Sequence, residues 1–569
     1  MNHPPLKKVP LAILFAVFAI INSQNLFGQA SNAPLNEDYY HWIDRYEVKA
    51  GKVFPQVFTT IKPYRRSDII DFVDSVESEG LFQSRADRFN RNYLRNDNWE
   101  WADSSNNVSN RPFLRHFYRK KSDFFHVNTK DFDLHVNPVI YFGAGNDSRV
   151  EDMLFTNTRG IEVRGMVDRK VGFYTYLTDN QAVLPAHVSD FRTRFGVLPH
   201  EGFTKVYKEG PGVDFLQARG YISFEATRHI NMQFGHDRFF VGNGVRSLAY
   251  SDFAPPALFL KTNVKVWKVN YMFLVNQMTA NPVGADKGYP MKYTAMHHIS
   301  MNIGKKFNLG IFESVVFNAN DSAKVNQFRI DYLNPIIFYR GIEQQNGSTD
   351  NALLGLDFKL NLIKKLSFYG QFLLDEMVIS HLRARDGWWA NKYAIQVGGK
   401  YVDAFGLPNL DLQGEINVVR PFTYSHYTAY GSYSHYRQPI AHPLGANFTE
   451  MIGVLRYQPI PKLYLTAKLF LVEIGRDTVG AYTNYGSDIT KLNSNRVPNK
   501  EIGNEQGQGF LNTIMYGNLT ASYQLKHNLF IDASLIIRKS ESEIPFYNNK
   551  STISSLALRW NIPQRHYEF

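Results

Sequence analysis

Apolar and polar residues alternate along two neighbouring segments near the middle of the chain. Residues 354–362 place Leu or Phe at every second position, with a polar residue or glycine between them. After a turn at Lys364 and Lys365, residues 366–374 repeat this alternation. Because successive side chains of a strand point to opposite faces, the pattern predicts a hairpin with one apolar and one polar face.

The same alternation recurs from Asp131 to the carboxy terminus. It predicts six further hairpins: 158–167 with 171–180, 213–226 with 230–236, 292–304 with 308–318, 393–402 with 410–418, 448–457 with 463–474, and 511–525 with 529–537. Their turns are short and the segments between hairpins are often long, which is the asymmetry of an outer-membrane barrel. The sequence therefore predicts an all-β transmembrane outer-membrane β-barrel of about 16 to 18 antiparallel strands, with a small helical bundle before it.

The amino terminus predicts export across the inner membrane. Lys7 and Lys8 precede the apolar run Leu11–Ile21, and a polar stretch follows that reaches Gly28-Gln29-Ala30, with small residues near a plausible cleavage site. A run of this length is too short for a membrane helix, which needs about 20 residues. We interpret residues 1–30 as a secretory signal peptide. The alternative is a buried amino-terminal helix.

Residues 31–130 lack the alternation and predict three short helices. One begins with Ser67 as its cap, a second covers roughly 82–94, and a third covers roughly 38–46. Helices with so little room for a core of their own suit a periplasmic bundle that packs on, or plugs, the mouth of the barrel formed by residues 131–569. The alternative is a soluble domain on a linker.

Composition narrows the chemistry. Of the 569 residues, 44% are hydrophobic and 15% aromatic, and an excess of Tyr and Phe is expected at two membrane interfaces. The chain has no cysteine, which excludes disulfides and a lipoprotein anchor. The net charge of +11 suits contact with lipid phosphate or an acidic polysaccharide, although charge speaks first to solubility. No nucleic-acid module and no cofactor motif is recognisable.

The last predicted strand carries an alternating apolar face. Leu556, Leu558, Trp560 and Ile562 form it, and the sequence closes on Phe569. A terminal aromatic residue is common in proteins handed to the outer-membrane insertion machinery, which is therefore a predicted partner.

Several segments resemble the capsule assembly protein Wzi family. They are Val241–Asp252 with Ala254–Pro256, Lys62–Arg66, and, resembling the branch of gliding bacteria that includes the gliding motility protein RemB, Tyr332–Arg340, Asp350–Gly355 and Ala441–Asn447. The resemblance covers about Asp38 to Phe569. It implies an outer-membrane barrel of about eighteen strands, closed on the periplasmic side by a helical bundle. It also implies lectin-like binding of surface polysaccharide, a part in gliding motility, and no catalysis.

An aromatic segment, Phe422–Tyr436, is the first candidate for sugar contact. Aromatic rings suit the apolar faces of sugars, while hydroxyl and imidazole groups satisfy the ring alcohols. The candidate residues are Tyr424, His426, Tyr427, Tyr430, Tyr433, His435 and Tyr436. The alternative is a packed loop that caps the barrel.

The loop Asp237–Pro256 is the second candidate. Its Arg246 and Asp252 are suited to an acidic or hydroxylated ligand, and Gly242 and Gly244 permit unusual backbone angles. The alternative is a folded loop held inside the barrel by an Arg–Asp pair. A mixed-charge lumen wall is also predicted, from Asp357, Lys359, Gln371, Asp375, Lys400, Asp411, Gln413 and Glu415.

Catalytic readings find little support in the sequence. Asp375 and Glu376 are neighbours on a strand and are expected to face opposite sides, as are His297 and His298. We therefore predict no catalytic and no metal residues. The first hypothesis is an outer-membrane, non-enzymatic barrel that binds or organises capsular or exopolysaccharide. The alternatives are a porin-like channel and, with less support, a membrane-embedded hydrolase.

Overall fold

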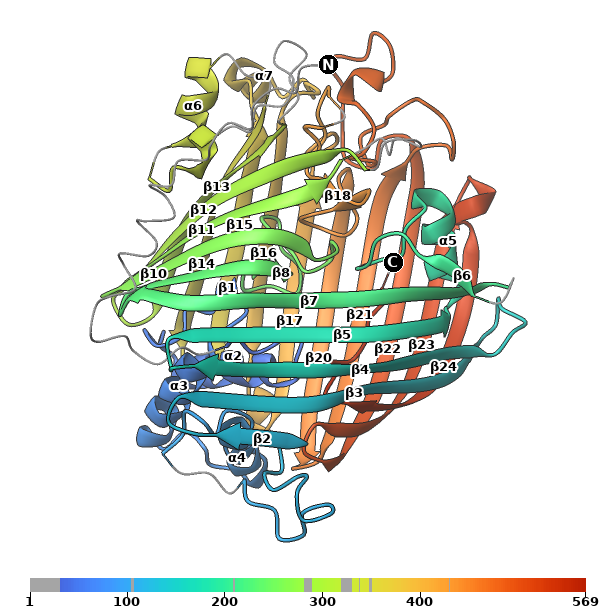
Figure 1. Ribbon diagram of the computed structural model, residues 1–569. Coiled ribbons are helices and arrows are strands. Elements are labelled where there is room, and N and C mark those ends of the chain that lie inside the picture. Colours follow the sequence, from blue (N-terminus) through green and yellow to red (C-terminus); the bar gives the residue numbers. More distant parts are fainter. Residues whose placement is uncertain are drawn as a thin grey trace, which may run out of the picture.

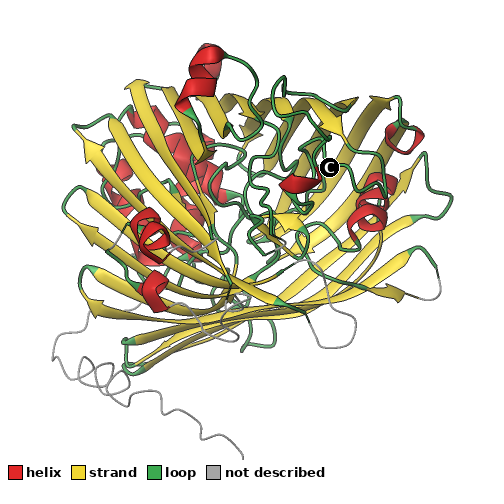
Figure 2. Cartoon of the chain, turned by 90° about the horizontal axis from the view of Figure 1, so that it is seen from above, coloured by secondary structure: helices red, strands yellow, loops and turns green. Residues whose placement is uncertain are grey.

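The computed structural model describes residues 31–103, 107–207, 210–280, 289–318, 330–336, 338–346, 350–428 and 430–568. Within them, 18 antiparallel strands close into one barrel, and β3 pairs with β24 at the seam (Figures 1 and 2). This confirms the predicted fold class. The predicted signal peptide lies outside the described residues, as does Phe569.

The barrel strands follow one another in chain order around the ring. They are β3 (Phe132–Asp147), β4 (Leu154–Val167), β5 (Val171–Val183), β7 (Gly212–Thr227), β8 (Ile230–Asp237), β10 (Ala257–Val266), β11 (Val269–Thr279), β12 (Met291–Ile303), β13 (Phe307–Phe317), β14 (Asn351–Ile363), β15 (Leu366–Glu376), β16 (Lys392–Tyr401), β17 (Leu410–Val419), β20 (Phe448–Ile460), β21 (Leu463–Arg476), β22 (Phe510–Lys526), β23 (Leu529–Ser542) and β24 (Asn549–Trp560).

Short strands and helices complete the described elements. The short strands are β1 (Ile61–Lys62), β2 (Phe125–Asn128), β6 (Lys205–Tyr207), β9 (Phe240–Val241), β18 (Ser434–His435) and β19 (Gln438–Pro439). The α-helices are α2 (Tyr39–Ala50), α3 (Arg66–Ser78), α4 (Arg85–Asp97), α5 (Ala186–Phe195), α6 (Tyr339–Asn346) and α7 (Ile379–Ala384), and the 3₁₀ turns are η1 (Ile330–Leu333), η2 (Ala404–Gly406), η3 (Asn493–Asn495) and η4 (Pro545–Tyr547).

All seven predicted hairpins are present. Their short turns lie at one end of the barrel, beside helices α2 to α4, at the bottom of Figure 1. Backbone hydrogen bonds join the two, from Val53 N to Lys305 O (2.8 Å) and from Lys365 N to Val48 O (2.9 Å). Most long connections lie at the other end, and in outer-membrane barrels the short turns are periplasmic and the long loops extracellular.

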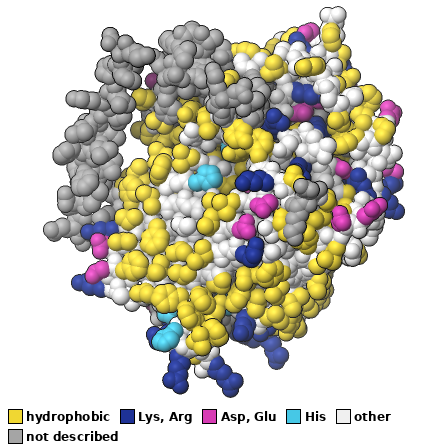
Figure 3. Space-filling view, turned by 45° about the vertical axis from the view of Figure 1, so that its right-hand side comes forward, with side chains coloured by type: hydrophobic (Ala, Val, Ile, Leu, Met, Phe, Trp, Pro, Cys, Tyr) yellow, Lys and Arg dark blue, Asp and Glu magenta, His cyan; other side chains and the backbone are white. Residues whose placement is uncertain are grey.

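The wall presents two chemically different faces. On β14, Leu356 and Leu362 are 41% and 44% exposed, whereas Asp357 and Lys359 between them are each 1% exposed. Hydrophobic side chains cover much of the outer wall, with basic side chains below them (Figure 3). This pattern is that of a lipid-facing exterior and a polar interior. Among the described residues, helices are all too short or too polar to span a membrane.

The amino-terminal helices lie close to their predicted positions, but two starts differ. Helix α3 begins two residues earlier than predicted, with Arg65 as its N-cap and no capping side chain, so the prediction of Ser67 as cap is wrong. Helix α4 begins at Arg85 rather than 82. Ser84 and Asp87 form its capping box, because the Ser84 side chain accepts from Asp87 N (2.8 Å) and the Asp87 carboxylate accepts from Ser84 N (3.1 Å).

Candidate functional site

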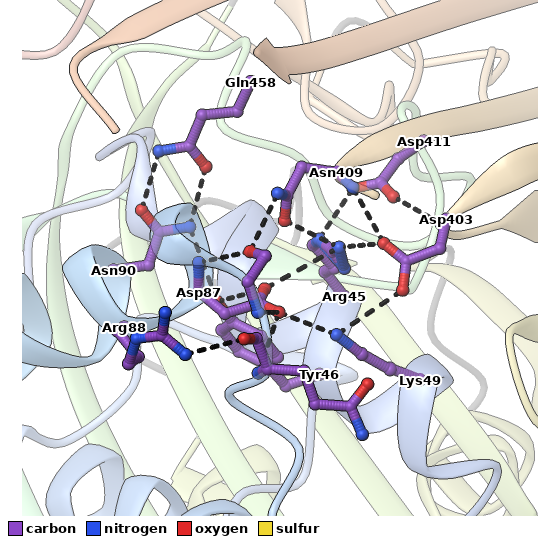
Figure 4. Close-up of polar contacts among 12 residues, drawn as sticks. Arg45, Tyr46, Lys49, Asp87, Arg88, Asn90, Asp403, Asn409, Asp411 and Gln458 are labelled. Atoms are coloured by element: carbon purple, nitrogen blue, oxygen red, sulfur yellow. Dashed lines mark hydrogen bonds and ion pairs between the residues drawn. The ribbon is translucent and has the colours of Figure 1, made fainter. Parts of the chain in front are cut away.

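Helix α2 ties the amino-terminal segment to the barrel wall (Figure 4). Its Arg45 is 2% exposed and contacts Asp403 and Asp411, with 3.2 Å from Nε to the Asp411 carboxylate. One turn later, Lys49 lies 2.8 Å from the carboxylate of Asp87 on α4. Buried charges are stable only when paired and hydrogen-bonded, so these contacts fix α2 against the wall.

A second cluster joins α2 to strands β14 and β16. The Asp44 carboxylate accepts from Lys359 Nζ (2.8 Å) and from Lys400 Nζ (2.6 Å), and Glu47 also pairs with Lys359. Burial alone would raise the pKa of Asp44, but the two lysines hold it well below its ordinary value. The predicted mixed-charge lumen wall is therefore the surface on which the helices sit.

Contacts on other strands spread these attachments around the ring. Asp97 of α4 pairs with His527 in the turn between β22 and β23 (3.1 Å), and Asp38 pairs with Arg559 of β24 (2.9 Å). Asn90 exchanges two hydrogen bonds with Gln458 of β20, at 2.8 and 2.9 Å. Strands far apart in the barrel thus hold the same small helical segment.

The connection between β8 and β10, residues 238–256, folds back into the lumen. Its β9 pairs with β1, and Glu415 of β17 accepts from the backbone N–H groups of Val245 (2.6 Å) and Arg246 (3.0 Å). A Cβ on Gly244 would lie 2.4 Å from that carboxylate, so only glycine fits there. The lumen loop is thereby fixed to the wall.

Arg246 and Asp252 have partners other than each other. Arg246 is 8% exposed and pairs with Glu450 (3.4 Å) and Glu568 (2.6 Å). The Asp252 carboxylate accepts from Asn36 Nδ2 (2.6 Å). Among the described residues, the loop is thus held by carboxylates of the wall and of the chain's last segment rather than by the expected internal Arg–Asp pair. Sugar contact at Arg246 and Asp252 stays a prediction, and the burial of Arg246 does not support it.

Residues 561–568 follow β24 and run inside the barrel, where Figure 1 places the C label. Arg565 donates to Thr158 Oγ1 (2.9 Å), the Tyr567 carbonyl lies 2.9 Å from His187 Nε2 of α5, and Glu568 lies 3.2 Å from Lys468. The last strand therefore ends at Trp560, several residues before the closing aromatic residue on which the predicted recognition by insertion machinery rests.

The aromatic segment divides into a buried part and an exposed part. Tyr424 and Tyr433 are buried, and their hydroxyls donate to the backbone carbonyls of Leu248 (2.8 Å) and Ala249 (2.9 Å) in the lumen loop. His435 is buried as well, 2.9 Å from Thr279 N. These three side chains have no surface to offer a sugar in this conformation. They follow the alternative of a packed capping loop.

Of the other four predicted residues, the three tyrosines lie nearer the surface of that loop and His426 does not. Tyr427 is 49% exposed, Tyr430 and Tyr436 are half-buried, and His426 is buried with its Nδ1 2.9 Å from Thr428 Oγ1. Sugar contact stays a prediction, supported by exposure at the three tyrosines and not at His426.

A pocket that the sequence did not reveal lies inside the extracellular end of the barrel. It has a cavity volume of about 80 Å³, and its walls come from α5, the β17–β20 and β21–β22 connections, β21, β22, β23 and the turn before β24. Its lining includes basic and aromatic side chains: Phe191, Arg194, Arg437, Arg476, Arg538 and Tyr547.

Electrostatics in this pocket favour an anionic or polar guest. The Arg476 and Arg194 guanidinium groups lie 5.3 and 5.7 Å from the Tyr547 ring centre. Burial, and next the charge of Arg538, lowers the pKa of His187 to about 3, so this imidazole is neutral at physiological pH. The arginines lie far apart in sequence, and no spacing links them. Only the register of the strands brings them together.

Two neighbouring histidines of β12 each contact a carboxylate. His297 lies 2.9 Å from Glu313, and Tyr339 of α6 stacks on its ring at 4.1 Å, whereas His298 lies 2.7 Å from Asp357 in the lumen. The two imidazoles face opposite sides, as predicted. The described residues hold no group of three or more metal-ligating side chains.

Asp375 and Glu376 depart from their predicted arrangement. A bulge between Leu374 and Glu376 lets both carboxylates reach Lys392, at 3.1 and 3.0 Å. The expectation that they face opposite sides is therefore wrong, because an extra residue breaks the alternation. Both are paired with the same lysine, an arrangement that braces the strand end.

These features define the class: an antiparallel β-barrel of the bacterial outer membrane with a filled lumen. No family model matches the chain, and no curated protein matches its sequence. Among solved structures, it is similar to Wzi, described as an outer membrane protein involved in group 1 capsule assembly in Escherichia coli and a carbohydrate-binding β-barrel. The TM-score is 0.55 at 12% identity, covering 94% of this chain and 100% of that one.

The barrel is also similar to Pseudomonas aeruginosa OpdL, with a TM-score of 0.41 at 8% identity over 76% of this chain and 99% of that one. At 12% identity, the likeness to the Wzi structure establishes the fold alone.

Proposed function

We propose that this chain is a plugged outer-membrane barrel that binds or organises surface polysaccharide, capsular or exopolysaccharide, at its extracellular end and catalyses no reaction. One observation carries the proposal: a pocket lined by four arginines and by Tyr547 lies inside the extracellular end of the barrel. The carbohydrate binding described for the similar Wzi barrel supports it. In this proposal residues 31–130 are the periplasmic plug.

Binding of polysaccharide to the detergent-solubilised protein tests the proposal. We expect Tyr427→Ala with Tyr430→Ala to weaken binding about 30-fold, because each ring contributes roughly 1 kcal/mol to stacking contacts. Tyr523→Ala is the matched control, since Tyr523 is 44% exposed on the outer wall near the periplasmic turns. Unchanged binding in the double variant removes the tyrosine loop from the proposal, and absence of binding by the wild type rejects the proposal itself.

A channel is the second candidate, and charged cavities in the lower lumen favour it. Two adjoining cavities of about 270 and 200 Å³ share Arg456 and Lys468 in their walls. We expect the wild type to be closed in planar bilayers and deletion of residues 31–130 to raise the conductance. A steady open pore in the wild type supports the channel, and an unchanged conductance after the deletion contradicts the plug.

The remaining alternatives carry less support. A part in gliding motility rests only on the sequence resemblance, and it is tested by surface spreading of a strain that lacks the gene. A hydrolase would need an acid/base pair, whereas the paired Asp375 and Glu376 both contact Lys392. Release of reducing ends from a bound polysaccharide would reject the non-enzymatic proposal.

A further inference from the structure

Positive charge exceeds negative charge in the extracellular pocket. Four arginines line it against two aspartates. Each aspartate already has a partner, because Asp488 lies 3.4 Å from Arg194 and Asp190 lies 2.9 Å from Arg149 outside the lining. Within the described part of the chain, no carboxylate lies within 4 Å of the guanidinium groups of Arg476 and Arg538. Two charges therefore lack a counterion inside a protein cavity, which is costly unless a ligand or solvent supplies one.

Hydrogen-bond donors in the same pocket are also unsatisfied. Arg538 is 8% exposed, and its Nη1 donates to Asn549 Oδ1 (2.6 Å), but its Nε has no partner among the described residues. The same holds for Arg476 Nε and for the hydroxyl of Tyr547. An oxyanion in the cavity would supply the acceptor that these three donors lack.

We infer that this pocket binds the anionic group of an acidic surface polysaccharide, a sugar carboxylate or sulfate ester, through Arg476, Arg538 and the Tyr547 hydroxyl. This inference rests on the proposed polysaccharide binding and names the class of polymer. Guanidinium groups bind planar oxyanions with paired hydrogen bonds, and Arg194 and Arg437 add to the attractive field. The cavity of about 80 Å³ has room for one charged substituent of a polymer and not for a length of chain.

The position of the pocket favours a polymer over a membrane lipid. Its wall residues include Ile514 and Ser540, which are buried and face the lumen, and Tyr547 covers it from the turn before β24. A lipid phosphate held at the outer wall would have to cross the sheet to reach these donors. The donors lie on the lumen side of the sheet, which a polysaccharide entering between the extracellular loops would reach without crossing the wall.

Three polymers of similar length separate the classes: a polyuronate, dextran sulfate and neutral dextran, each titrated into the detergent-solubilised full-length protein by calorimetry. We expect the polyuronate or dextran sulfate to bind at least 10-fold tighter than dextran and to weaken as salt rises. The preferred polymer identifies the charged group. Equal affinity for neutral and acidic polymers overturns the inference while leaving the proposed function intact, and no binding of any polymer overturns both.

Two variants locate the binding. Arg476→Gln with Arg538→Gln should lower affinity for the acidic polymer by about 10- to 100-fold, because each arginine contributes a charge-assisted hydrogen bond. Arg538→Lys keeps the charge but loses the planar guanidinium. Its affinity for the acidic polymer should lie between that of the wild type and that of the double variant. Arg228→Gln, an exposed change that removes one positive charge at a periplasmic turn, is the control. An equal loss in Arg228→Gln, or none in the double variant with an unchanged thermal midpoint, overturns the inference.

Discussion

At the scale of single residues, buried charges hold the amino-terminal helices against the barrel wall. Arg45 lies within 4 Å of Asp87, Asp403 and Asp411, and all four side chains are largely buried. A buried pair contributes little compared with a well-packed apolar substitute, but removal of one partner leaves the others uncompensated. The loss of stability on removing Arg45 therefore depends on the carboxylates that would be left unpaired.

Replacement of Arg45 by Met should destabilise the plug. We expect the free energy of unfolding to fall by about 3–5 kcal/mol and conductance events to appear in planar bilayers. Thermal unfolding and single-molecule current recordings measure the two effects. The control is Arg95→Met, because Arg95 pairs with the exposed Asp74 and such surface pairs contribute at most about 1 kcal/mol. Equal effects of the two changes would contradict the assigned role of Arg45.

Tyrosines of one segment should respond differently to truncation. Tyr433→Ala is expected to lower the free energy of unfolding by about 3–5 kcal/mol, because it removes a buried ring and leaves the carbonyl of Ala249 without its hydrogen-bond donor. Tyr427→Ala should change it by less than about 0.5 kcal/mol, because that ring is half exposed. Midpoints of thermal unfolding compare the two. A large loss in Tyr427→Ala would show that this ring is also part of the core.

Contacts at this scale were the least predictable from sequence. The spacing of three between Tyr424, Tyr427, Tyr430 and Tyr433 carries no facing information in an irregular loop, so buried and exposed rings were treated alike. The pair Arg45–Asp403 joins residues 358 positions apart. No local pattern in the sequence predicts a contact between residues so far apart in the chain. Only the closed ring brings the two together.

At the scale of elements, alternation predicted well because it is a local property. Every hairpin inferred from period two is present, since a lipid-facing strand has to keep one face apolar along its length. Helix starts are harder to predict, because a cap is a single residue: the sequence favours Ser67 as a cap, whereas the structure has its capping box at Ser84 and Asp87. The bulge before Glu376 also depends on a single extra residue, so alternation predicts the wrong face for this side chain.

Acid should loosen the helical segment from the wall. Burial alone would raise the pKa values of Asp44, Asp87 and Asp97, but their basic partners hold all three below the ordinary 3.8. The unfolded aspartates bind protons at higher pH than the folded ones, so the stabilisation is full above about pH 3.8 and is lost as the pH falls below it.

Planar-bilayer recordings against pH test this. We expect no current between about pH 5 and pH 8, and opening only below about pH 4. Arg45→Met, already deprived of one basic partner, should open at a higher pH than the wild type. Opening of the wild type between about pH 6 and pH 7 would contradict the assignment to aspartates and point to histidines.

At the scale of the whole molecule, the seam between β3 and β24 completes the ring. Ala144 and Leu556 lie directly opposite each other across it, on the lipid-facing side. Directly paired residues of antiparallel strands have Cα atoms about 4.5–5.5 Å apart, within the range of a disulfide. The chain has no cysteine of its own to compete.

Cysteines at these two positions should lock the seam. We expect the oxidised Ala144→Cys and Leu556→Cys double variant to gain roughly 2–4 kcal/mol in stability, lost on reduction. Thermal midpoints with and without reductant measure the gain, and Leu556→Cys alone is the control. A midpoint that reductant does not change, in protein shown by mass to be cross-linked, would contradict a closed seam at this register.

Global closure and strand number followed from the sequence, because length and hairpin count limit both. The filling of the lumen did not. Residues 561–568 have no alternation that distinguishes a strand end from an inward tail, and the fold of residues 238–256 depends on Glu415 and Gln371 of the distant wall.

The contact of α6 with the outer wall has a consequence for the surrounding membrane. Tyr332, Tyr339 and Ile342 pack over Phe273, Val315 and Phe317 of β11 and β13, on the side away from the lumen. Lipids next to this sector meet a peptide layer instead of strand side chains. The molecule therefore has a wider footprint in the outer leaflet than its ring of strands alone, and its annulus of lipid is interrupted over one arc.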